Sequence, residues 1–437
     1  MNTRTGHKLT YLDNNATTFM SEETIDTINK WFNRGNPSAL YASAKQGQKM
    51  MAELRAYVTE LCDLDAYDIV FTSCASESNT HIIVSTVRAW SRKHAAPAPH
   101  IVSTGIEHKS IINCVAELVA DGLATATEVD AQVDGTILPA DIEAAIKPNT
   151  CMVICMAANN ETGAINDVAR IGGIAHAAGL PLFTDGVQLF GRSPIKPGKY
   201  NIDAFSVSAH KFGGPVGVGM LIVSKKWVGE YGLCAHICGS QNSGMRGGTE
   251  NVPLIAGMYA ALRESQVDRR GKNSACRMLR TSLVGMLKQH VPVMSLPEYI
   301  ALRAAHRPAI DQGTDAWDIK LADSPFARLL SGVAIVTLTP ASSLPNTLLL
   351  AVIRRGICNS NMRQWLMDRG IIVSIGSACN TGDKKASHVL YSMRVPRELY
   401  GGTLRISLGD SSAAGDLRAF MREFIPMISS DCCKKSK

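Results

Sequence analysis

Apolar segments of strand length alternate with helix-length amphipathic stretches between about residues 65 and 260. The expected strands are residues 68–71, 100–103, 150–158, 182–184, 204–207 and 218–223, and the expected helices are residues 76–92, 109–120, 141–146 and 167–178. This alternation is typical of a layered α/β domain with a largely parallel sheet. Ligands of such sheets bind beyond the carboxyl ends of the strands. We therefore expect the site among the polar residues that follow these strands.

The pattern changes after about residue 262. Helical residues 275–289 lead into residues 292–345, which show no convincing period and which we expect to be an irregular insert. A smaller α/β unit follows, with expected elements at residues 347–353, 361–369, 404–408 and 414–428. We therefore predict a large domain over residues 15–262 and a small domain formed by residues 1–14 and 263–437.

Composition narrows the class of protein. The chain has 437 residues, of which 46% are hydrophobic and 19% charged, as in ordinary soluble globular proteins with more than one domain. No stretch reaches the roughly 20 apolar residues that a membrane span requires. Residues 1–8 contain no apolar signal core, so we expect a cytoplasmic protein. Its twelve cysteines are then expected to be reduced thiols and not a disulfide framework.

The charge of +7 is mild for this length. Basic residues come in pairs, such as Lys225-Lys226 and Lys384-Lys385, and not as a stripe with interleaved aromatic residues. This favours a solvated surface over nucleic-acid binding, and it is compatible with an acidic protein partner.

One segment invites a metal hypothesis. Cys234, His236 and Cys238 lie close together in sequence, and Cys432 and Cys433 would add two thiols. A tetrahedral zinc site usually needs two well-spaced pairs of ligands. Because the spacing here is irregular, we expect no metal site.

Three polar segments follow expected strands and carry candidate chemistry. Lys211 lies beside Ser208 and His210, and a desolvated lysine with cationic neighbours becomes a nucleophilic amine. Asp185 ends another strand, where a carboxylate could face a pyridinium nitrogen. Ser76 lies where a strand runs into a long helix, a natural phosphate cradle, although an ordinary N-cap serine is the alternative there.

Cys379 differs from the other cysteines in its surroundings. It lies in a loop of small polar residues after the apolar residues 371–375, whereas Cys151 and Cys155 lie in an apolar run. A thiol is chemically useful where it is reachable and can ionise, and Lys384 and Lys385 would lower its pKa. We expect a mobile catalytic loop over about residues 376–390.

Taken in order along the chain, these segments resemble the class V aminotransferase group of fold-type I, pyridoxal-phosphate-dependent enzymes, and within it the cysteine desulfurases. The landmarks are residues 11–18, 35–38, 71–79, 107–109, 159–163, 185–188, 208–211, 246–253, 376–379 and 405–409. The resemblance implies a large domain with a mostly parallel sheet, a smaller C-terminal α/β domain, and a homodimer.

The resemblance also implies a role for each residue. Lys211 would hold pyridoxal 5′-phosphate and take the Cα proton, with His108 stacked on the ring. The other cofactor-binding residues would be Asp185 at the pyridine nitrogen, Gln188 and Asn160 at the phenolic oxygen, Ala75, Ser76, Ser208 and His210 at the phosphate, and Thr249 reaching the phosphate from the other subunit.

The substrate and the sulfur acceptor follow from the same resemblance. Arg405, with Asn160, would bind the carboxylate of L-cysteine, because a guanidinium can bind a carboxylate through two hydrogen bonds. The Cys379 thiolate would attack the substrate sulfur, leaving a persulfide and L-alanine. The persulfide would then pass to an acceptor such as an Fe–S scaffold protein.

Several positions depart from the family pattern, and three other functions stay open. Cys74 stands where glycine is common, Ser76 where threonine is common, Tyr41 where histidine is common, and Asp410 where arginine is common. A selenocysteine lyase or a class V aminotransferase would keep the lysine and the aspartate. A non-catalytic scaffold for sulfur transfer is the alternative from another class of protein.

Overall fold

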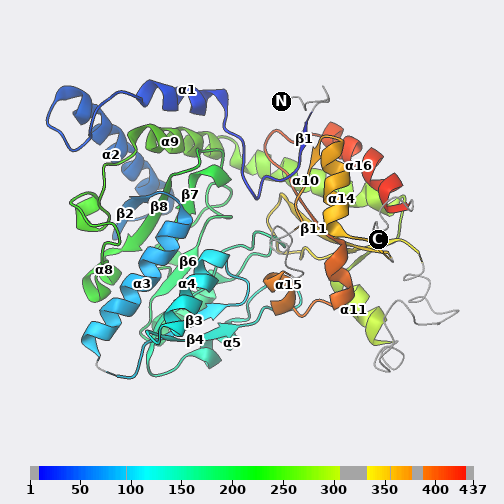
Figure 1. Ribbon diagram of the computed structural model, residues 1–437, viewed down its shortest axis with the longest axis horizontal. Helices are drawn as coiled ribbons and strands as arrows, with labels where there is room; N and C mark the ends of the chain where they lie inside the picture. Colours follow the sequence, from blue (N-terminus) through cyan, green and yellow to red (C-terminus); the bar gives the residue numbers. More distant parts are fainter. Residues whose placement is uncertain (1–8, 95, 306–331, 355, 376–386, 430–437) are drawn as a thin grey trace.

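Two layered units, each built around its own sheet, make up the molecule. The computed structural model describes residues 9–94, 96–305, 332–354, 356–375 and 387–429. In Figure 1 the larger unit lies on the left and the smaller one on the right. The chain begins in the smaller unit at β1 and crosses to the larger unit before α1. The domain boundaries near residues 15 and 262 stay a prediction.

The larger unit contains a seven-stranded sheet. Its order is β2 (Tyr67–Thr72), β8 (Gly219–Ser224), β7 (Ala204–Ser208), β6 (Leu182–Asp185), β5 (Thr150–Ile154), β3 (His100–Thr104) and β4 (Thr125–Val129). Strand β8 runs antiparallel to both of its neighbours, and the other neighbouring strands are parallel. The predicted α/β fold with a mostly parallel sheet is therefore confirmed.

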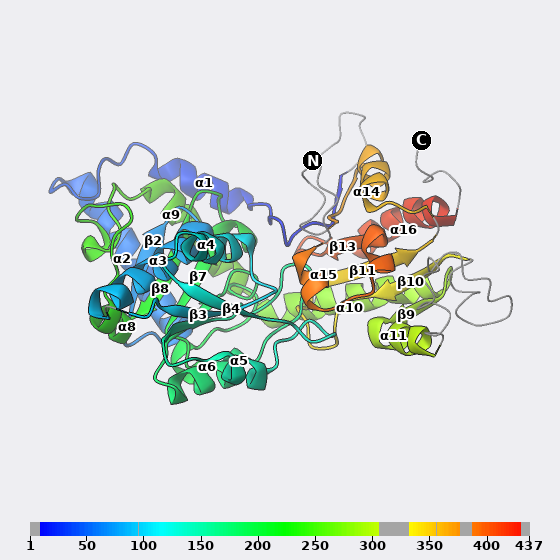
Figure 2. The ribbon, with the colours of Figure 1, turned by 60° about the horizontal axis from the view of Figure 1, so that its bottom comes forward.

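Helices cover both faces of this sheet. One face packs against α2 (Ala42–Cys62), α5 (Pro139–Ala145), α6 (Val168–Ala177) and α9 (Val252–Gln266), and α1 (Glu22–Trp31) lies outside them on α9. The other face packs against α3 (Ala75–Lys93), α4 (Lys109–Ala120) and α8 (Lys225–Tyr231). Figure 2 shows α4 and α5 on opposite sides of β3 and β4. Because side chains of a strand alternate between faces, Val70 joins one core while Ile69 and Phe71 join the other.

The smaller unit contains a four-stranded and a two-stranded sheet. The first has the order β13 (Thr403–Ser407), β11 (Thr347–Ile353), β10 (Ala334–Thr337) and β9 (Val293–Ser295), and the second pairs β1 (Thr10–Tyr11) with β12 (Ile371–Ile372). The helices here are α10 (Arg269–Lys288), α11 (Leu296–Ala304), α14 (Asn359–Asp368), α15 (His388–Ser392) and α16 (Ala414–Ser429). Bridges between Asp13 and Ser407, and between Ser374 and Arg405, bring three distant segments together.

Two segments differ from the sequence prediction. Strand β4 was not expected, because it is an edge strand with mostly exposed side chains and therefore lacks apolar alternation. The supposedly irregular residues 292–345 contain β9, α11 and β10. Strand β9 is too short for a visible period, but Ser295 and Glu298 form a capping box that signals the start of α11.

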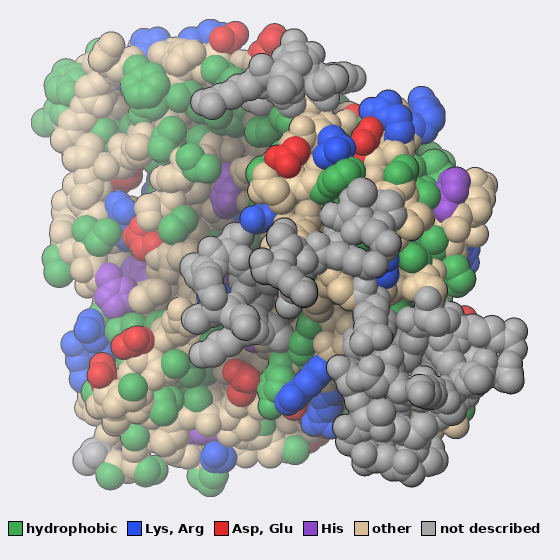
Figure 3. Space-filling model, turned by 45° about the vertical axis from the view of Figure 1, so that its right-hand side comes forward, with side chains coloured by type: hydrophobic (Ala, Val, Ile, Leu, Met, Phe, Trp, Pro, Cys, Tyr) green, Lys and Arg blue, Asp and Glu red, His purple; other side chains and the backbone are tan. Residues whose placement is uncertain are grey.

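The described residues form no large patch of one charge on the face seen in Figure 3. Lys and Arg side chains (blue) lie there in separate small groups, with acidic side chains (red) between some of them, among the residues that the structure describes. No described helix combines the length and the apolarity that crossing a bilayer requires.

Candidate functional site

A cavity of about 420 Å³ opens at the carboxyl ends of β6 and β7. It is lined by Asn15, Ala16, Cys74, Ala75, Ser76, Asn79, His108, Met156, Asn160, Asp185, Val187, Gln188, Ser208, His210, Lys211, Ser374 and Arg405. The lining comes from both units, and it includes ten of the residues that the sequence analysis selected. The volume suits a small ligand that carries several polar groups.

Lys211 ends a short 3₁₀ turn, η1 (Ala209–Lys211), that follows β7. Its Nζ donates to the carbonyl oxygens of Asn15 (2.8 Å) and Ala16 (2.9 Å). Burial, and then the positive charge of Arg405, lower the pKa of Lys211 from 10.5 to about 8. A large fraction of this amine is therefore neutral in mildly alkaline solution, and a neutral amine can act as a nucleophile or take up a proton.

Asp185 ends β6 and is almost completely buried. Its Oδ1 accepts from the backbone nitrogen of Val187 (3.0 Å), and its Oδ2 accepts from Asn79 Nδ2 (3.3 Å). Gln188 follows on the next turn and donates from Nε2 to the Asn15 carbonyl oxygen (3.1 Å), while no residue that the structure describes bonds to its buried Oε1. A fixed carboxylate of this kind suits a protonated ring nitrogen.

His108 is the N-cap of α4. Its Nδ1 accepts from the backbone nitrogen of Ser110 (3.2 Å), so the neutral ring carries its proton on Nε2. The preceding residue, Glu107, is fully buried and accepts from Thr104 Oγ1 (2.6 Å) and from the Met156 nitrogen (2.7 Å). Burial raises the pKa of Glu107 to about 8. These contacts fix the backbone that presents the imidazole to the cavity.

The start of α3 is suited to bind a phosphate. The N-cap residue is Cys74, whose side chain makes no capping hydrogen bond, and Ser76 is the second helical residue. The N-cap alternative for Ser76 is therefore wrong. Uncapped amides at the start of a 19-residue helix attract an anion, and Ser208 and His210 line the same cavity. Burial lowers the pKa of His210 to about 4, so its imidazole is neutral.

Glu77 would oppose an anion at this helix start if its charge were not balanced. Arg246 binds it through two hydrogen bonds, from Nε to Oε1 (2.8 Å) and from Nη2 to Oε2 (3.2 Å). The guanidinium therefore offsets the carboxylate close to the proposed phosphate position. Together, the helix start, Asp185 and Lys211 present the donors and acceptors that a phosphate-bearing pyridine aldehyde requires.

Arg405, on β13, is the cationic group that the smaller unit adds to the cavity. Its Nη2 lies 2.6 Å from Asp13 Oδ1, and its Nη1 donates to the carbonyl oxygen of Asn160 (2.9 Å). Its buried Nε has no hydrogen-bond partner among the described residues. The guanidinium therefore keeps donors for a small carboxylate.

Asp13 and Asn15 are site residues that the sequence analysis missed. The Asn15 side chain donates to Thr347 Oγ1 (2.8 Å) and to the Asn160 carbonyl oxygen (3.2 Å), and it accepts from Asn346 Nδ2 (3.0 Å). Their segment, residues 11–18, was recognised only as a landmark. The signal that could have found them is three consecutive polar residues, 13–15, that begin two positions after the end of β1.

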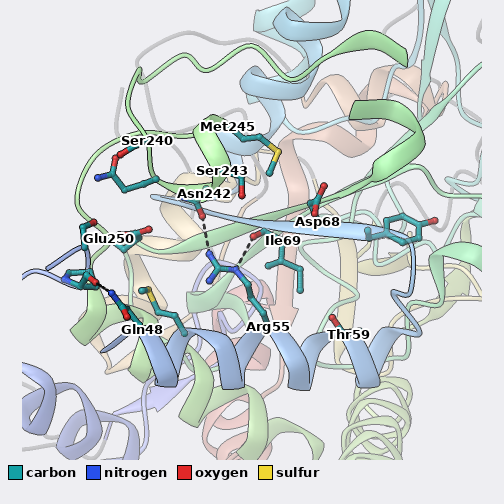
Figure 4. A pocket seen from close by; sticks show the side chains of 15 residues that line it. Gln48, Arg55, Thr59, Asp68, Ile69, Ser240, Asn242, Ser243, Met245 and Glu250 are labelled. Carbon is teal, nitrogen blue, oxygen red and sulfur yellow. Dashed lines mark hydrogen bonds between the residues drawn. The ribbon is translucent and has the colours of Figure 1, made fainter. Parts of the chain in front are cut away.

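Thr249 does not line the cavity of its own chain, and its side chain is exposed. Its loop is held by Asn242, whose Oδ1 accepts from Arg55 Nη2 (3.2 Å) and from the Phe71 nitrogen (3.1 Å). Figure 4 shows Arg55 extending from α2 toward this loop and β2, at a second pocket of about 560 Å³. Arg55 therefore anchors the loop that carries Thr249.

Cys379, Lys384 and Lys385 lie outside the described residues. The described chain on either side meets the cavity region: Ser374 lines the cavity, and Ser387 Oγ donates to the buried Glu161 (2.7 Å). The expected loop over residues 376–390 therefore stays a prediction, except that residues 388–390 belong to α15.

The Cys234–Cys238 segment shows no metal-like grouping. Within the described ranges, no three His, Cys, Asp or Glu side chains gather closely enough to hold an ion. The Cys234 Sγ instead accepts from Arg92 Nη1 (3.3 Å), and Cys238 is exposed. Cys432 and Cys433 fall beyond the described residues.

Comparisons with known proteins agree with this geometry. The family profile described as aminotransferase class-V matches residues 10–290. A cysteine desulfurase of Cereibacter sphaeroides is 31% identical over 422 residues, which cover 96% of this chain and 95% of that protein. The cysteine desulfurase IscS of Methanosarcina thermophila is 29% identical over 430 residues, which cover 98% of this chain and 93% of that protein. A solved NifS-like protein superposes with a TM-score of 0.77 at 26% identity, and the match covers 96% of this chain and 99% of that one.

Proposed function

The chain belongs to the class V aminotransferase family, among its cysteine desulfurases, and we propose that it uses pyridoxal 5′-phosphate to take sulfur from L-cysteine. The products are L-alanine and a persulfide on Cys379. One observation carries the proposal. A single cavity holds an amine of lowered pKa, a buried carboxylate and a buried guanidinium, which are Lys211, Asp185 and Arg405.

The cofactor, when bound, supplies an electron sink for negative charge at the substrate Cα. Asp185 would hold the proton on its ring nitrogen, because an adjacent carboxylate favours the protonated form. Gln188 and Asn160, which line the cavity, would hydrogen-bond the phenolic oxygen. The imidazole of His108 would stack on the ring.

The substrate is oriented by charge and deprotonated by an amine. Arg405 binds its carboxylate, and the neutral Nζ of Lys211 takes the Cα proton and later returns a proton to carbon. The Cys379 thiolate forms a bond to the substrate sulfur as the Cβ–S bond breaks, and the electron pair of that bond stays with the carbon fragment. L-Cysteine and one enzyme thiol therefore give L-alanine and one enzyme persulfide.

We also propose a homodimer with shared sites. Ala75, Ser76, Ser208 and His210 hold the phosphate within one chain, and Thr249 reaches the site of the second copy. This is supported by the exposed position of Thr249, outside the cavity of its own chain. The nine cysteines of the described part are free thiols, which suits a cytoplasmic enzyme. The sulfur acceptor would be a protein such as an Fe–S scaffold.

The function is tested by incubating the protein with pyridoxal 5′-phosphate and L-cysteine. We expect alanine and, with a reductant, sulfide in equal amounts, and a mass increase of one sulfur atom on the peptide that contains Cys379. Cys379→Ser should keep the cofactor absorbance and lose both products, because no thiolate can accept the sulfur. Cys238→Ser, which changes an exposed thiol, should behave like the wild type.

The results of this experiment distinguish a cysteine desulfurase from the three alternative functions. Activity that survives in Cys379→Ser with a keto acid as product would indicate an aminotransferase. Release of alanine from selenocysteine but not from cysteine would indicate a selenocysteine lyase. A protein that binds no cofactor would be the scaffold.

The lowered pKa of Lys211 gives a prediction of pH dependence. Only the neutral amine reacts with an aldehyde, so the rate at which cofactor-free protein captures pyridoxal 5′-phosphate should rise with pH through a midpoint near 8. Stopped-flow absorbance between pH 6 and pH 11 measures this rate, with N-α-acetyl-lysine as the reference amine. A midpoint close to that of the reference amine, near pH 10.5, would contradict the burial of Lys211.

A further inference from the structure

Asp13 lies where the N-terminal segment meets the last strand of the smaller unit. Its backbone forms an isolated bridge to Ser407, and the next residue, Asn14, donates from its backbone nitrogen to the Ser407 carbonyl oxygen (3.1 Å). The Tyr11 hydroxyl donates to the Asp13 carbonyl oxygen (3.1 Å). The carboxylate therefore projects from a backbone that is fixed on both sides.

This carboxylate holds one side of the Arg405 guanidinium. The Asp13 and Arg405 side chains are 16% and 6% exposed, and their Oδ1 and Nη2 atoms are 2.6 Å apart. Asn160 holds a second guanidinium nitrogen through its carbonyl oxygen. Two acceptors from different segments fix the plane of the guanidinium. Without Asp13, a mostly buried cation would lose its anion and much of its orientation.

Asp13 also belongs to the set of charges around Lys211. Arg405 and Arg192 disfavour the protonated amine, whereas Asp185 and Asp13 favour it. The neighbouring His210 is neutral, because burial lowers its pKa to about 4. Removing the charge of Asp13 leaves two cations against one anion near Lys211, which would lower the pKa of the amine further.

We propose that Asp13 is a positioning residue that orients the Arg405 guanidinium for the substrate carboxylate and balances the charges around Lys211. This inference rests on the proposed function, since it assigns Arg405 to the carboxylate of an amino acid. Asp13 touches neither the substrate nor the cofactor in this role.

The test is Asp13→Asn in the full-length holoenzyme. A charge-assisted contact contributes about 1.5–3 kcal/mol, so the KM for L-cysteine should rise about 10- to 100-fold, with a smaller change in kcat. L-Alanine, which carries the same carboxylate, should bind more weakly by a similar factor in calorimetry. In cofactor-free protein, the midpoint pH for capture of pyridoxal 5′-phosphate should shift below the wild-type value, because the protonated amine has lost a favourable anion.

Two further variants make the result decisive. Glu398→Gln removes a carboxylate of similar burial that pairs with Arg303 (2.8 Å) away from the cavity, and it should leave KM and the midpoint pH unchanged. Asp13→Glu keeps the charge but displaces it by one methylene group. It should therefore raise KM while leaving the midpoint pH unchanged, and it carries the test if Asp13→Asn does not fold.

An unchanged KM in both Asp13 variants, or a lower KM in Asp13→Asn, would overturn the proposal. A lower KM would mean that Asp13 competes with the substrate for Arg405. If the wild-type protein turns over no cysteine at all, the proposed function fails. In that case the midpoint pH for cofactor capture by Asp13→Asn still tests whether the Asp13 charge acts on Lys211. A midpoint equal to that of the wild type would overturn this part of the proposal.

Discussion

Lys211→Ala is expected to lose cysteine turnover by about 10²- to 10⁴-fold, the usual contribution of a general base. The Nζ atom of this cavity residue is held by the carbonyl oxygens of Asn15 and Ala16. A methyl group cannot take the Cα proton or bond to the cofactor aldehyde. The variant should therefore bind pyridoxal 5′-phosphate only reversibly, and borohydride should no longer fix the cofactor to the protein.

Two matched variants show whether this effect belongs to the amine. Lys226→Ala removes an exposed lysine of α8 and should keep full activity and full cofactor content. Lys211→Arg retains the positive charge but offers no neutral amine at accessible pH, so it should be as inactive as the alanine variant. Borohydride fixation of the cofactor to another lysine in Lys211→Ala, with turnover near the wild-type rate, would contradict the assignment.

Asp185→Asn is expected to lower kcat by about 10- to 100-fold. A hydrogen bond to a charged group contributes about 1.5–3 kcal/mol, and tenfold in rate corresponds to about 1.4 kcal/mol. The amide is nearly isosteric, and its single oxygen can keep the contact to the Val187 nitrogen, while the charge and the acceptor for Asn79 Nδ2 are lost. The ring nitrogen should then lose its proton at a lower pH, which the pH dependence of the cofactor spectrum measures.

Asp203 provides the control for this variant. It is a buried carboxylate immediately before β7, it accepts from the Leu182 nitrogen (2.9 Å) and from His176 (2.7 Å), and it does not line the cavity. Asp203→Asn should lower the melting temperature and leave kcat per folded molecule unchanged. If Asp185→Asn behaves in the same way, Asp185 is a structural residue and not a partner of the ring.

Six strands and four helices of the larger unit could be predicted from sequence because their patterns are local, whereas α1, α2, α8 and α9 were not among the expected elements. The six expected strands correspond to β2, β3, β5, β6, β7 and β8, and the four expected helices correspond to α3, α4, α5 and α6. The strands that were missed are β4, β9 and β10. Strand β4 is an edge strand with exposed side chains and β9 has only three residues, so neither carries a period that a sequence pattern can reveal. Strand β10 is apolar but has only four residues, and it lies in the part of the chain that was expected to be irregular.

The residues of the site also fall into those that a local pattern reveals and those that it does not. Lys211, Asp185 and Ser76 follow strands directly, so the rule that ligands bind at the carboxyl ends of strands selected them without a structure. Arg405 and Thr249 were selected only by resemblance to a family. Asp13 was not selected at all, because its partner lies 392 residues away in sequence.

The sequence by itself determined the fold class and selected Lys211, Asp185 and the helix start at Ser76, because each depends on residues close together in the chain. Only the tertiary structure decided how the charges balance. The pKa of Lys211 near 8 arises from burial and from Arg405, and Arg405 is itself held by Asp13. Desolvation and Coulomb interactions depend on distances in space, and these are set when the N-terminal segment, β7 and β13 pack around one cavity.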